Sequence, residues 1–526
     1  MLDSPVTDGP GAAGAAGPAD AAAPAGAPRP ADAAGPAGAA DRAGAAGKVA
    51  LEWIDSAQDK LTAVSDTIWR FAEVGLEEVR SAGLLKEELA RAGFKVSSGV
   101  AGLPTAFTAV WGAGRPVLGF LAEYDALPHL SQAVSVERRP LEEGAPGHGC
   151  GHNLLGAGVL GAVLGLKEEM VRDGLPGTII FFGCPAEELL VGKVFMAREG
   201  LFDDLDAALT WHPEDRNGLW VGTQALNSAK FTFRGVAAHA AANPDCGRSA
   251  LDAVELMNVA ANYLREHVPE DSRLHYVITE GGGEPNVVPA RAEVWYYVRG
   301  ATRPIVDDIH SRLLRCAQGA ALMTDTTFEV RLLTACYEFL PNKTLGELAT
   351  ECLKTVGPAA WTREELDFAR RLAETFGPGR KEAALRAAGL PAEYLGKVLD
   401  DTIGPPGRPM AGSSDVADVS WVAPTVNLTT SCGPLGIAFH SWQMTAVSGM
   451  SIGHKGMLLA AKTLAMAGSR LLREPELLAA ARAEFLAATR DRPYKCAVPP
   501  EVGPGPDRGN GTEGTEGGEG DAVVRP

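Results

Sequence analysis

The chain has 526 residues, 46% of them hydrophobic and 22% charged, a balance typical of a soluble globular protein with several domains. Its 48 basic and 66 acidic side chains give a formal net charge of −18, which argues against binding to nucleic acid or to an anionic membrane surface. The best apolar run, Leu154 to Leu166, is too short to span a bilayer, and the N-terminus lacks a signal-peptide pattern. We therefore expect a cytoplasmic protein.

Both ends of the chain have the composition of disordered tails. Residues 1–50 contain 20 Ala, 9 Gly and 7 Pro, and the segment after Glu501 is rich in Gly, Glu and Pro. We predict five segments: a tail over 1–47, a catalytic domain in two parts over 48–222 and 338–495, an inserted domain over 223–337, and a second tail over 496–526.

Between the tails, strand-like and helix-like segments alternate. The apolar runs Pro116–Ala122 and Gly177–Gly183 predict buried strands, and the segment Leu154–Arg172 between them predicts a helix. This order is the βαβ unit of an α/β domain with a mainly parallel sheet.

From about Gly222 the pattern changes to strand, helix, strand, strand, helix and strand. The segments are 229–235, 249–266, 274–279, 292–299, 305–322 and 328–333. This order predicts a small two-layer α+β domain of the ferredoxin-like type. After about residue 340 the chain is helical, and we expect a strand near Val426 and a helix over 450–468 to return it to the first domain.

The strongest local motif is Pro146-Gly-His-Gly-Cys-Gly-His152, directly before the helix predicted from Leu154. Imidazole and thiolate are preferred ligands of zinc and related ions, and glycines allow closely spaced side chains to converge. The alternative is a flexible loop with incidental polar residues.

Further candidate ligands follow other predicted strands. Glu187 and Glu188 come after the strand ending at Gly183, His212 follows an apolar run, and His440 lies in the returning segment. Taken alone, the Glu pair would be a solvated surface pair and each His a core residue. Together with the first motif they supply five ligands that two metal ions sharing a bridge would use. These five are Cys150, His152, Glu188, His212 and His440.

Other polar residues allow two interpretations each. Asn286 and Arg299 suit a carboxylate ligand, but they fit a turn-forming Asn and a surface Arg equally well. Asp125 either orients a ligand histidine or caps the turn before Pro128. His239 follows a strand of the inserted domain.

These motifs resemble the M20 metallopeptidase family, and its amidohydrolase branch in particular, from about Trp53 to Leu472. The motifs that carry the resemblance are Gly-His-Gly-Cys150-Gly-His152, Pro-Ala-Glu187-Glu188, Trp-His212-Pro, His239-Ala-Ala and Asn286-Val-Val-Pro. The resemblance implies that the five ligands hold two divalent ions, Zn or Mn. One departure is Asn153, where much of the branch has Asp; Asn can hydrogen-bond but cannot be an anionic partner of a ligand.

The resemblance also implies roles for single residues. Cys150 would bridge the two ions, and Glu187 would be the general base for the attacking water. His239 would stabilise the oxyanion across a dimer interface made by the small domain, and Asn286 and Arg299 would contact the substrate.

The implied activity is metal-dependent hydrolysis of an N-acyl or N-aroyl amino acid such as p-aminobenzoyl-glutamate. The protein would act as a homodimer or as a heterodimer with an A-type subunit. The alternatives are a weakly active or non-catalytic partner subunit, and a dipeptidase or N-acyl amino acid deacetylase.

Overall fold

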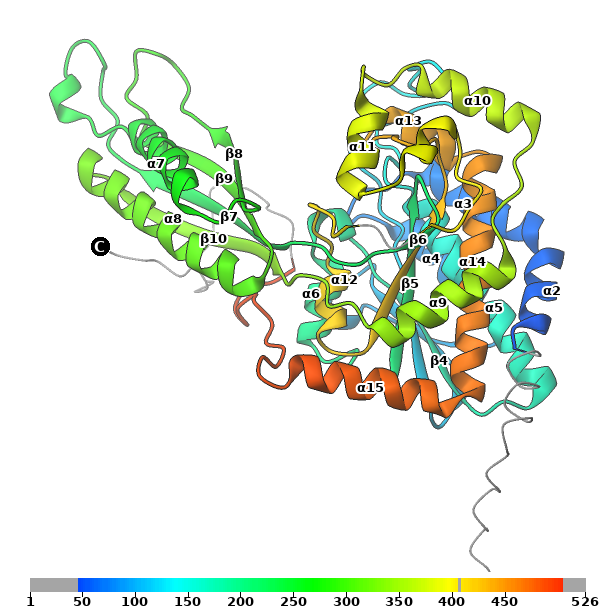
Figure 1. The fold of residues 1–526 in the computed structure, drawn as a ribbon. Coiled ribbons are helices and arrows are strands. Elements are labelled where there is room, and N and C mark those ends of the chain that lie inside the picture. The colour runs from blue at the N-terminus through cyan, green and yellow to red at the C-terminus, as the bar shows by residue number, and fades with distance from the viewer. Residues whose placement is uncertain (1–45, 405–407, 505–526) are drawn as a thin grey trace, which may run out of the picture.

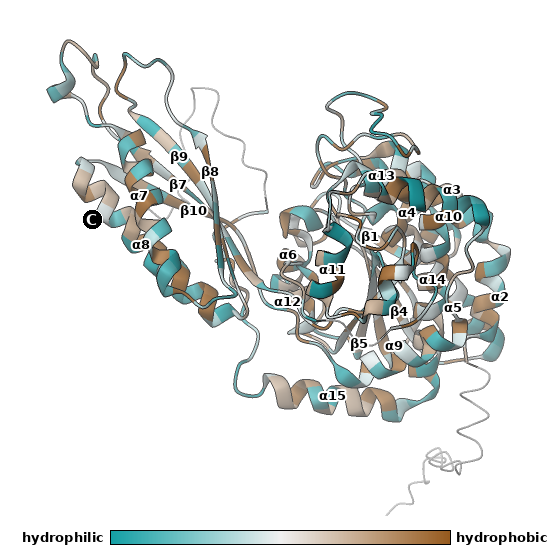
Figure 2. Ribbon diagram, turned by 45° about the horizontal axis from the view of Figure 1, so that its top comes forward, coloured by the Kyte–Doolittle hydropathy of each residue, from teal (hydrophilic) through white to brown (hydrophobic). Residues whose placement is uncertain are grey.

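The computed structural model describes residues 46–404 and 408–504. The chain forms a large α/β body and a smaller body that projects from it (Figures 1 and 2). The predicted tail over 1–47 lies outside the described residues except for its last two positions, and so does the tail over 496–526 beyond residue 504. None of the described helices is long and apolar enough to cross a membrane.

The large body is built on a seven-stranded sheet in the order β1-β2-β4-β3-β5-β11-β6. Its four central strands are mutually parallel, and antiparallel pairings occur only toward the two edges. The α/β class with a mainly parallel sheet is therefore confirmed. The strands are β1 Lys95–Ser98, β2 Phe107–Ala113, β3 Val117–Ala122, β4 Gly177–Gly183, β5 Ala207–Glu214, β6 Gly218–Leu219 and β11 Thr425–Ser431.

The central strands are buried along their length because helices cover both faces of the sheet, and β3 and β4 are almost entirely apolar. Phe120 and Phe181 pack into the larger core with α2 to α5, α9 and α14. The next residues, Leu121 and Phe182, point the other way and pack with α6 and α12. The helices of this body are α2 Lys48–Ser56, α3 Gln58–Phe71, α4 Val79–Arg91, α5 His152–Asp173, α6 Gly192–Arg198, α9 Lys343–Val356, α10 Arg363–Ala373, α11 Arg380–Ala388, α12 Val416–Ser420, α13 Trp442–Ser448, α14 Ser451–Arg473 and α15 Pro475–Thr489.

The small body is a four-stranded antiparallel sheet in the order β10-β7-β9-β8, with α7 and α8 packed on one face. Its elements follow one another as strand, helix, strand, strand, helix and strand. They are β7 Ala225–Arg234, α7 Ala250–Leu264, β8 Arg273–Glu280, β9 Arg291–Gly300, α8 Arg303–Thr324 and β10 Thr327–Cys336. The chain then re-enters the large body, where β11 pairs in parallel with β5.

Candidate metal centre

The candidate ligands come from loops and strand ends at the carboxyl edge of the large sheet. Cys150 lies in the loop before α5, and His152 is the first residue of that helix. Gly151 between them has a φ of 80°, a left-handed conformation that glycine adopts without strain and that turns the two neighbouring side chains toward one site. His212 lies in β5, and Glu188 follows β4. Sequence positions from 150 to 440 therefore converge at a single edge.

The five side chains form two overlapping groups. The ligand atoms of Cys150, His152 and His212 lie within 4.8 Å of one another, and so do those of Cys150, Glu188 and His440. The Cys150 Sγ lies 3.5 Å from His212 Nε2, and the Glu188 Oε2 lies 3.2 Å from His440 Nε2. Because Cys150 belongs to both groups, the arrangement suits two neighbouring cations that share one thiolate.

Both buried histidines are held by their Nδ1 atoms. The His152 Nδ1 lies 2.8 Å from Asp125 Oδ1, and the His212 Nδ1 lies 2.7 Å from the carbonyl oxygen of Pro213. The second Asp125 oxygen accepts a hydrogen bond from the Glu188 N–H at 2.9 Å. Each ring therefore presents Nε2 to the centre, which is the usual geometry of a metal-binding histidine with an outer partner.

The electrostatics of the centre also fit a cation. Burial lowers the pKa of His212 to about 3, so its imidazole is neutral. Burial, with Glu188 nearby, raises the pKa of the Cys150 thiol well above its usual value. The His152 Nε2 and Glu188 Oε1 atoms are buried without a hydrogen-bond partner among the described residues. A divalent ion would satisfy these atoms and hold the thiolate.

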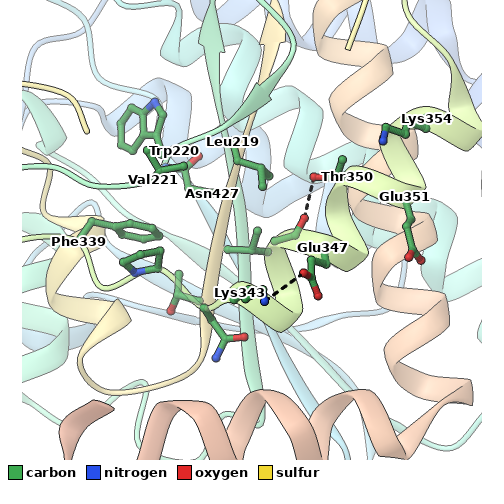
Figure 3. A pocket seen from close by; sticks show the side chains of 15 residues that line it. Leu219, Trp220, Val221, Phe339, Lys343, Glu347, Thr350, Glu351, Lys354 and Asn427 are labelled. Atoms are coloured by element: carbon green, nitrogen blue, oxygen red, sulfur yellow. Dashed lines mark hydrogen bonds and ion pairs between the residues drawn. The ribbon is translucent and has the colours of Figure 1, made fainter. Parts of the chain in front are cut away.

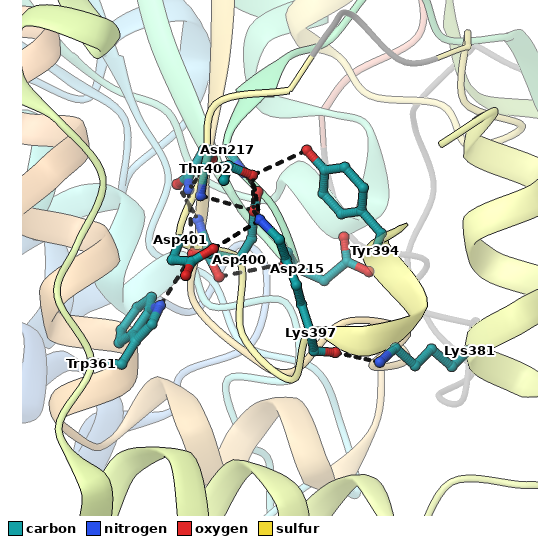
Figure 4. A network of polar contacts seen from close by, with 10 residues as sticks. Asp215, Asn217, Trp361, Lys381, Tyr394, Lys397, Asp400, Asp401 and Thr402 are labelled. Carbon is teal, nitrogen blue, oxygen red and sulfur yellow. Dashed lines mark hydrogen bonds and ion pairs between the residues drawn. The ribbon is translucent and has the colours of Figure 1, made fainter. Parts of the chain in front are cut away.

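The loop that carries His440 is braced by polar contacts from several elements. Asp215 accepts a hydrogen bond from the Gly436 N–H at 2.8 Å, and Asn217 accepts one from the Ser431 N–H at 2.9 Å. The buried Asp400 in turn accepts from the Asn217 N–H at 2.9 Å, within a wider network of polar contacts (Figure 4). His440 itself has a φ of 57°, and its N–H donates to the carbonyl of Gly149 at 2.8 Å. This bond ties its loop to the Cys150 loop and supports the left-handed backbone.

Glu187 lies beside the ligand groups and is 7% exposed. Burial raises the pKa of its carboxyl well above the usual value, and the nearby Glu123 and Asp415 raise it further. One Glu187 oxygen also lies within 4.8 Å of ligand atoms of Glu123 and His152. A buried carboxyl with a raised pKa next to a metal site is suited to accept and return a proton.

A cavity of about 330 Å³ opens onto the ligand groups. Its wall includes aromatic and apolar side chains from both parts of the large body and from the small body. Arg299, at the end of β9, reaches into it and donates from Nη1 to the Ser413 Oγ at 2.8 Å. The lining residues include Leu190, Trp220, Tyr297, Met410 and Phe439, besides Glu187 and the four candidate ligands Cys150, Glu188, His212 and His440. The cavity thus combines a cation with aromatic surfaces beside the candidate metal centre.

His239 and Asn286 do not line this cavity. They lie together, because the Ala240 N–H donates to the Asn286 carbonyl at 2.9 Å and His239 bridges to Val287. Both are exposed, and they lie near the start of β9, whereas Arg299 lies at the end of that strand. At about 3.3 Å per residue, the length of β9 alone places Arg299 roughly 25 Å from His239 and Asn286. Within one chain, Asn286 and Arg299 therefore cannot contact the same small ligand.

Asn153 does not contact the ligand histidine. Its Nδ2 donates to the Ser65 Oγ at 3.0 Å and to the Ser448 carbonyl at 2.9 Å. It therefore ties the start of α5 to α3 and α13. The anionic partner of the His152 Nδ1 is Asp125 instead.

Sequence reasoning missed a buried ion triad behind the centre. The Lys193 Nζ lies 2.8 Å from Glu123 Oε1 and 2.5 Å from Asp415 Oδ1, and its side chain is fully buried. Burial alone would lower the pKa of Lys193, but Asp415 and Glu123 outweigh it and hold the pKa well above its usual value. The other Glu123 oxygen lies 3.3 Å from His152 Nε2. The triad therefore connects a ligand histidine to the segment that carries Ser413.

Comparisons with known proteins give the family. Residues 119–426 match the model of peptidase family M20/M25/M40. The chain is 42% identical over 468 residues to the B-type subunit of p-aminobenzoyl-glutamate hydrolase from Escherichia coli, covering 86% of this chain and 97% of that protein. It is 30% identical over 450 residues to the Xaa-Arg dipeptidase of Mus musculus, covering 83% and 91% of the two chains.

Among solved structures, the YXEP protein of Bacillus subtilis is described as a dinuclear metal binding peptidase from the M20 family. It matches with a TM-score of 0.52 and 16% identity, over 80% of this chain and 99% of that one. This likeness supports the fold. With the family match and the two curated relatives, it leads to one conclusion: the chain belongs to peptidase family M20/M25/M40 and is a hydrolase of amide bonds.

Proposed function

We propose that this protein is a metal-dependent amidohydrolase that releases the amino acid from an N-aroyl amino acid of the p-aminobenzoyl-glutamate type. The observation that carries the proposal is the pair of ligand groups sharing Cys150, beside a cavity that also holds Glu187 and Arg299. The name of the Escherichia coli relative supports this substrate class.

In this proposal the centre takes two divalent ions, Zn or Mn. Cys150, His152 and His212 would hold one, and Cys150, Glu188 and His440 would hold the other. When bound, the ions would supply Lewis-acid chemistry at the scissile amide. Imidazole, thiolate and carboxylate ligands are compatible with either metal.

Glu187 is the proposed general base. Its raised pKa lets the carboxylate take a proton from the attacking water and later give it to the leaving amine. The burial that raises the pKa also limits competition from bulk water for that proton. Because Glu188 rather than Glu187 would ligate a metal ion, the Glu187 carboxylate stays free for this proton transfer.

The cavity wall supports the substrate class. Arg299 can form a two-pronged contact with a carboxylate of the amino acid product. Trp220, Tyr297 and Phe439 offer aromatic surfaces for the aroyl group. A non-catalytic role is less well supported, because the described residues include all five candidate ligands and the proposed base.

We also propose that the protein acts as a dimer through its small body, in the cytoplasm. Strand β8 lies at the edge of its sheet, and its Tyr276, Val277 and Ile278 are exposed. An apolar edge strand of this kind is available for pairing with a second copy or another chain. A dimer would let the exposed His239 of one protomer reach the centre of the other. All eight cysteines are unpaired, as expected in a reducing compartment.

The dimer partner is either a second copy of this chain or a different one. The Escherichia coli relative is named as the B-type subunit of its hydrolase, and a second relative from that organism is named as the A-type subunit of the same hydrolase. These names support a hetero-oligomer, whereas the exposed β8 edge is compatible with both arrangements.

The test is hydrolysis by the purified chain supplied with Zn²⁺ or Mn²⁺. The substrates would be p-aminobenzoyl-glutamate, N-acetyl amino acids and dipeptides ending in Arg, with Glu188→Ala as the ligand-deficient control. We expect glutamate release from the aroyl substrate by the wild type alone. A higher kcat/KM for the dipeptides would favour a dipeptidase, and no turnover with both ions bound would favour a dependent or non-catalytic subunit.

A further inference from the structure

The cavity beside the candidate metal centre contains one carboxyl group that has no part in the proposed metal binding or proton transfer. Glu214 is the last residue of β5 and is 6% exposed, and its side chain lines the cavity. Side chains two positions apart on a strand point to the same face, so Glu214 lies on the side of His212. The two positions are about 6.6 Å apart along the strand, close to the length of a para-substituted benzene ring.

The carboxyl group of Glu214 is oriented by Trp220. The Trp220 Nε1 donates to the Glu214 Oε1 at 3.4 Å, and Trp220 lines the same cavity. Trp220 also borders a second cavity, of about 640 Å³, between β6, β11 and α9. Figure 3 shows that second cavity, where the indole nitrogen of Trp220 points away from the other labelled side chains. A carboxyl group accepts more than one hydrogen bond, so Glu214 keeps acceptor capacity for a ligand.

Glu214 and Arg299 line this cavity together without pairing with each other. Among the described residues, no basic side chain forms an ion pair with Glu214, and no acidic side chain forms one with Arg299. The Arg299 Nη1 donates instead to the Ser413 Oγ at 2.8 Å. Burying a polar group is unfavourable unless a partner satisfies it. An acidic and a basic side chain that stay apart in one cavity are therefore suited to two different groups of one ligand.

Aromatic rings of the cavity wall lie beside the metal ligand that is nearest to Glu214 on β5. The Trp220 ring lies 4.8 Å from the His212 ring, and the Phe439 ring lies 5.8 Å from it. An aromatic acyl group bound at the metal centre would find these ring surfaces on the side of Glu214. Arg299 comes from the small body and suits the carboxylate of the amino acid, so Glu214 is left for the acyl group.

We propose that Glu214 is a specificity-determining residue that accepts a hydrogen bond from an N–H donor at the far end of the aroyl group. The amino group of a p-aminobenzoyl group is such a donor. This inference rests on the proposed function, because it takes an N-aroyl amino acid as the substrate. An aroyl group without the donor would leave the buried carboxyl group desolvated and without that partner. The enzyme should therefore prefer the acyl group with the donor over one of the same shape without it.

The test compares p-aminobenzoyl-glutamate with p-methylbenzoyl-glutamate, which has the same shape but lacks the donor. The readout is the ratio of the two kcat/KM values, measured with the metal-loaded full chain. The amino group also changes the reactivity of the amide, and dividing the ratio of each variant by the wild-type ratio cancels this effect. In Glu214→Met we expect the ratio to fall by about fivefold to fiftyfold, the discrimination that one hydrogen bond to a buried acceptor supplies.

Two further variants control this result. Glu214→Gln keeps the size of the side chain and one acceptor oxygen, and its ratio should fall by about twofold or more because a neutral oxygen is the weaker acceptor. Glu347→Met removes an exposed carboxyl group that does not line the cavity, so it should keep the wild-type ratio. Circular dichroism and metal content would show that each variant is folded. If Glu214→Met does not fold, a wild-type ratio in Glu214→Gln overturns the proposal.

A binding measurement separates this inference from the proposed function. The dissociation constants of the two compounds would be measured with metal-loaded Glu187→Gln, which lacks the proposed base. Tighter binding of the amino compound, lost when Glu214→Met is added, would support the inference even if the wild type hydrolysed neither compound. Hydrolysis of both compounds, with the wild-type ratio retained in Glu214→Met, would overturn the inference and leave the proposed function standing. Equal dissociation constants for the two compounds would also overturn it.

Discussion

Replacing Lys193 by Met should destabilise the protein strongly. The substitution keeps an apolar side chain of similar length but removes the ammonium that lies between Glu123 and Asp415. Both carboxylates are almost completely buried, so two negative charges would remain without a counter-charge. Breaking a buried ion pair in this way costs about 3–5 kcal/mol of unfolding free energy.

The assay is urea unfolding of the metal-loaded protein, followed by circular dichroism. Lys343→Met is the matched control, because Lys343 is 80% exposed and faces Glu347 at 3.7 Å. Its loss should cost about 0–1 kcal/mol. The double variant Lys193→Met/Asp415→Asn should be more stable than Lys193→Met, since one of the uncompensated charges is gone. A Lys193→Met protein as stable as the Lys343→Met control would refute this reasoning.

The other predictions concern the site. Cys150→Ala should lower the metal content, measured by elemental analysis, below about two ions per chain, because the variant lacks the ligand common to both groups. An unchanged metal content would contradict the proposal that Cys150 bridges the two ions. Arg299→Met should raise the KM for p-aminobenzoyl-glutamate by about tenfold or more, since a charged contact with the substrate is lost. The control Arg315→Met, on the exposed side of α8, should keep the wild-type KM. A wild-type KM in Arg299→Met would show that Arg299 does not contact the substrate. Mixing inactive His239→Ala with inactive Glu187→Gln should restore part of the activity, because a hybrid dimer has one complete site; no recovery would argue against a contribution across the interface.

Strands β3 and β4 of the central sheet could be predicted because they are buried on both faces and read as nearly continuous apolar runs. Pro116–Ala122 and Gly177–Gly183 agree with β3 and β4 to within one residue. The antiparallel edge strands were missed. The residues of β1, Lys95–Ser98, are polar and exposed except for the half-buried Val96, and β6 has only two residues. Neither strand therefore produces a hydrophobic periodicity in the sequence.

The sequence predicted those site residues that lie in short local motifs. It did not predict contacts between residues that are far apart in the sequence. Cys150 and His152 are two residues apart, and the structure brings them together with the other three candidate ligands. Lys193 and Asp415 are 222 positions apart, and a single Lys in a helix usually lies at the surface. Only the fold shows that this Lys is buried.

The pairing of Asn286 with Arg299 shows a second limit of sequence reasoning. Thirteen positions suggest proximity, but an extended strand places the two residues at opposite ends of the small body. Their roles remain predictions, and a shared site would require a second protomer.

The measurement that tests the central claim most directly is metal content and turnover in the same preparation of Glu187→Gln. Gln keeps the size of the side chain but cannot accept the proton. We predict wild-type metal content and a kcat lower by about 10²–10⁴-fold on p-aminobenzoyl-glutamate. Loss of metal in this variant would indicate that Glu187 is itself a metal ligand, which its closeness to Glu123 and His152 allows. Turnover close to that of the wild type would contradict the proposal that Glu187 is the general base.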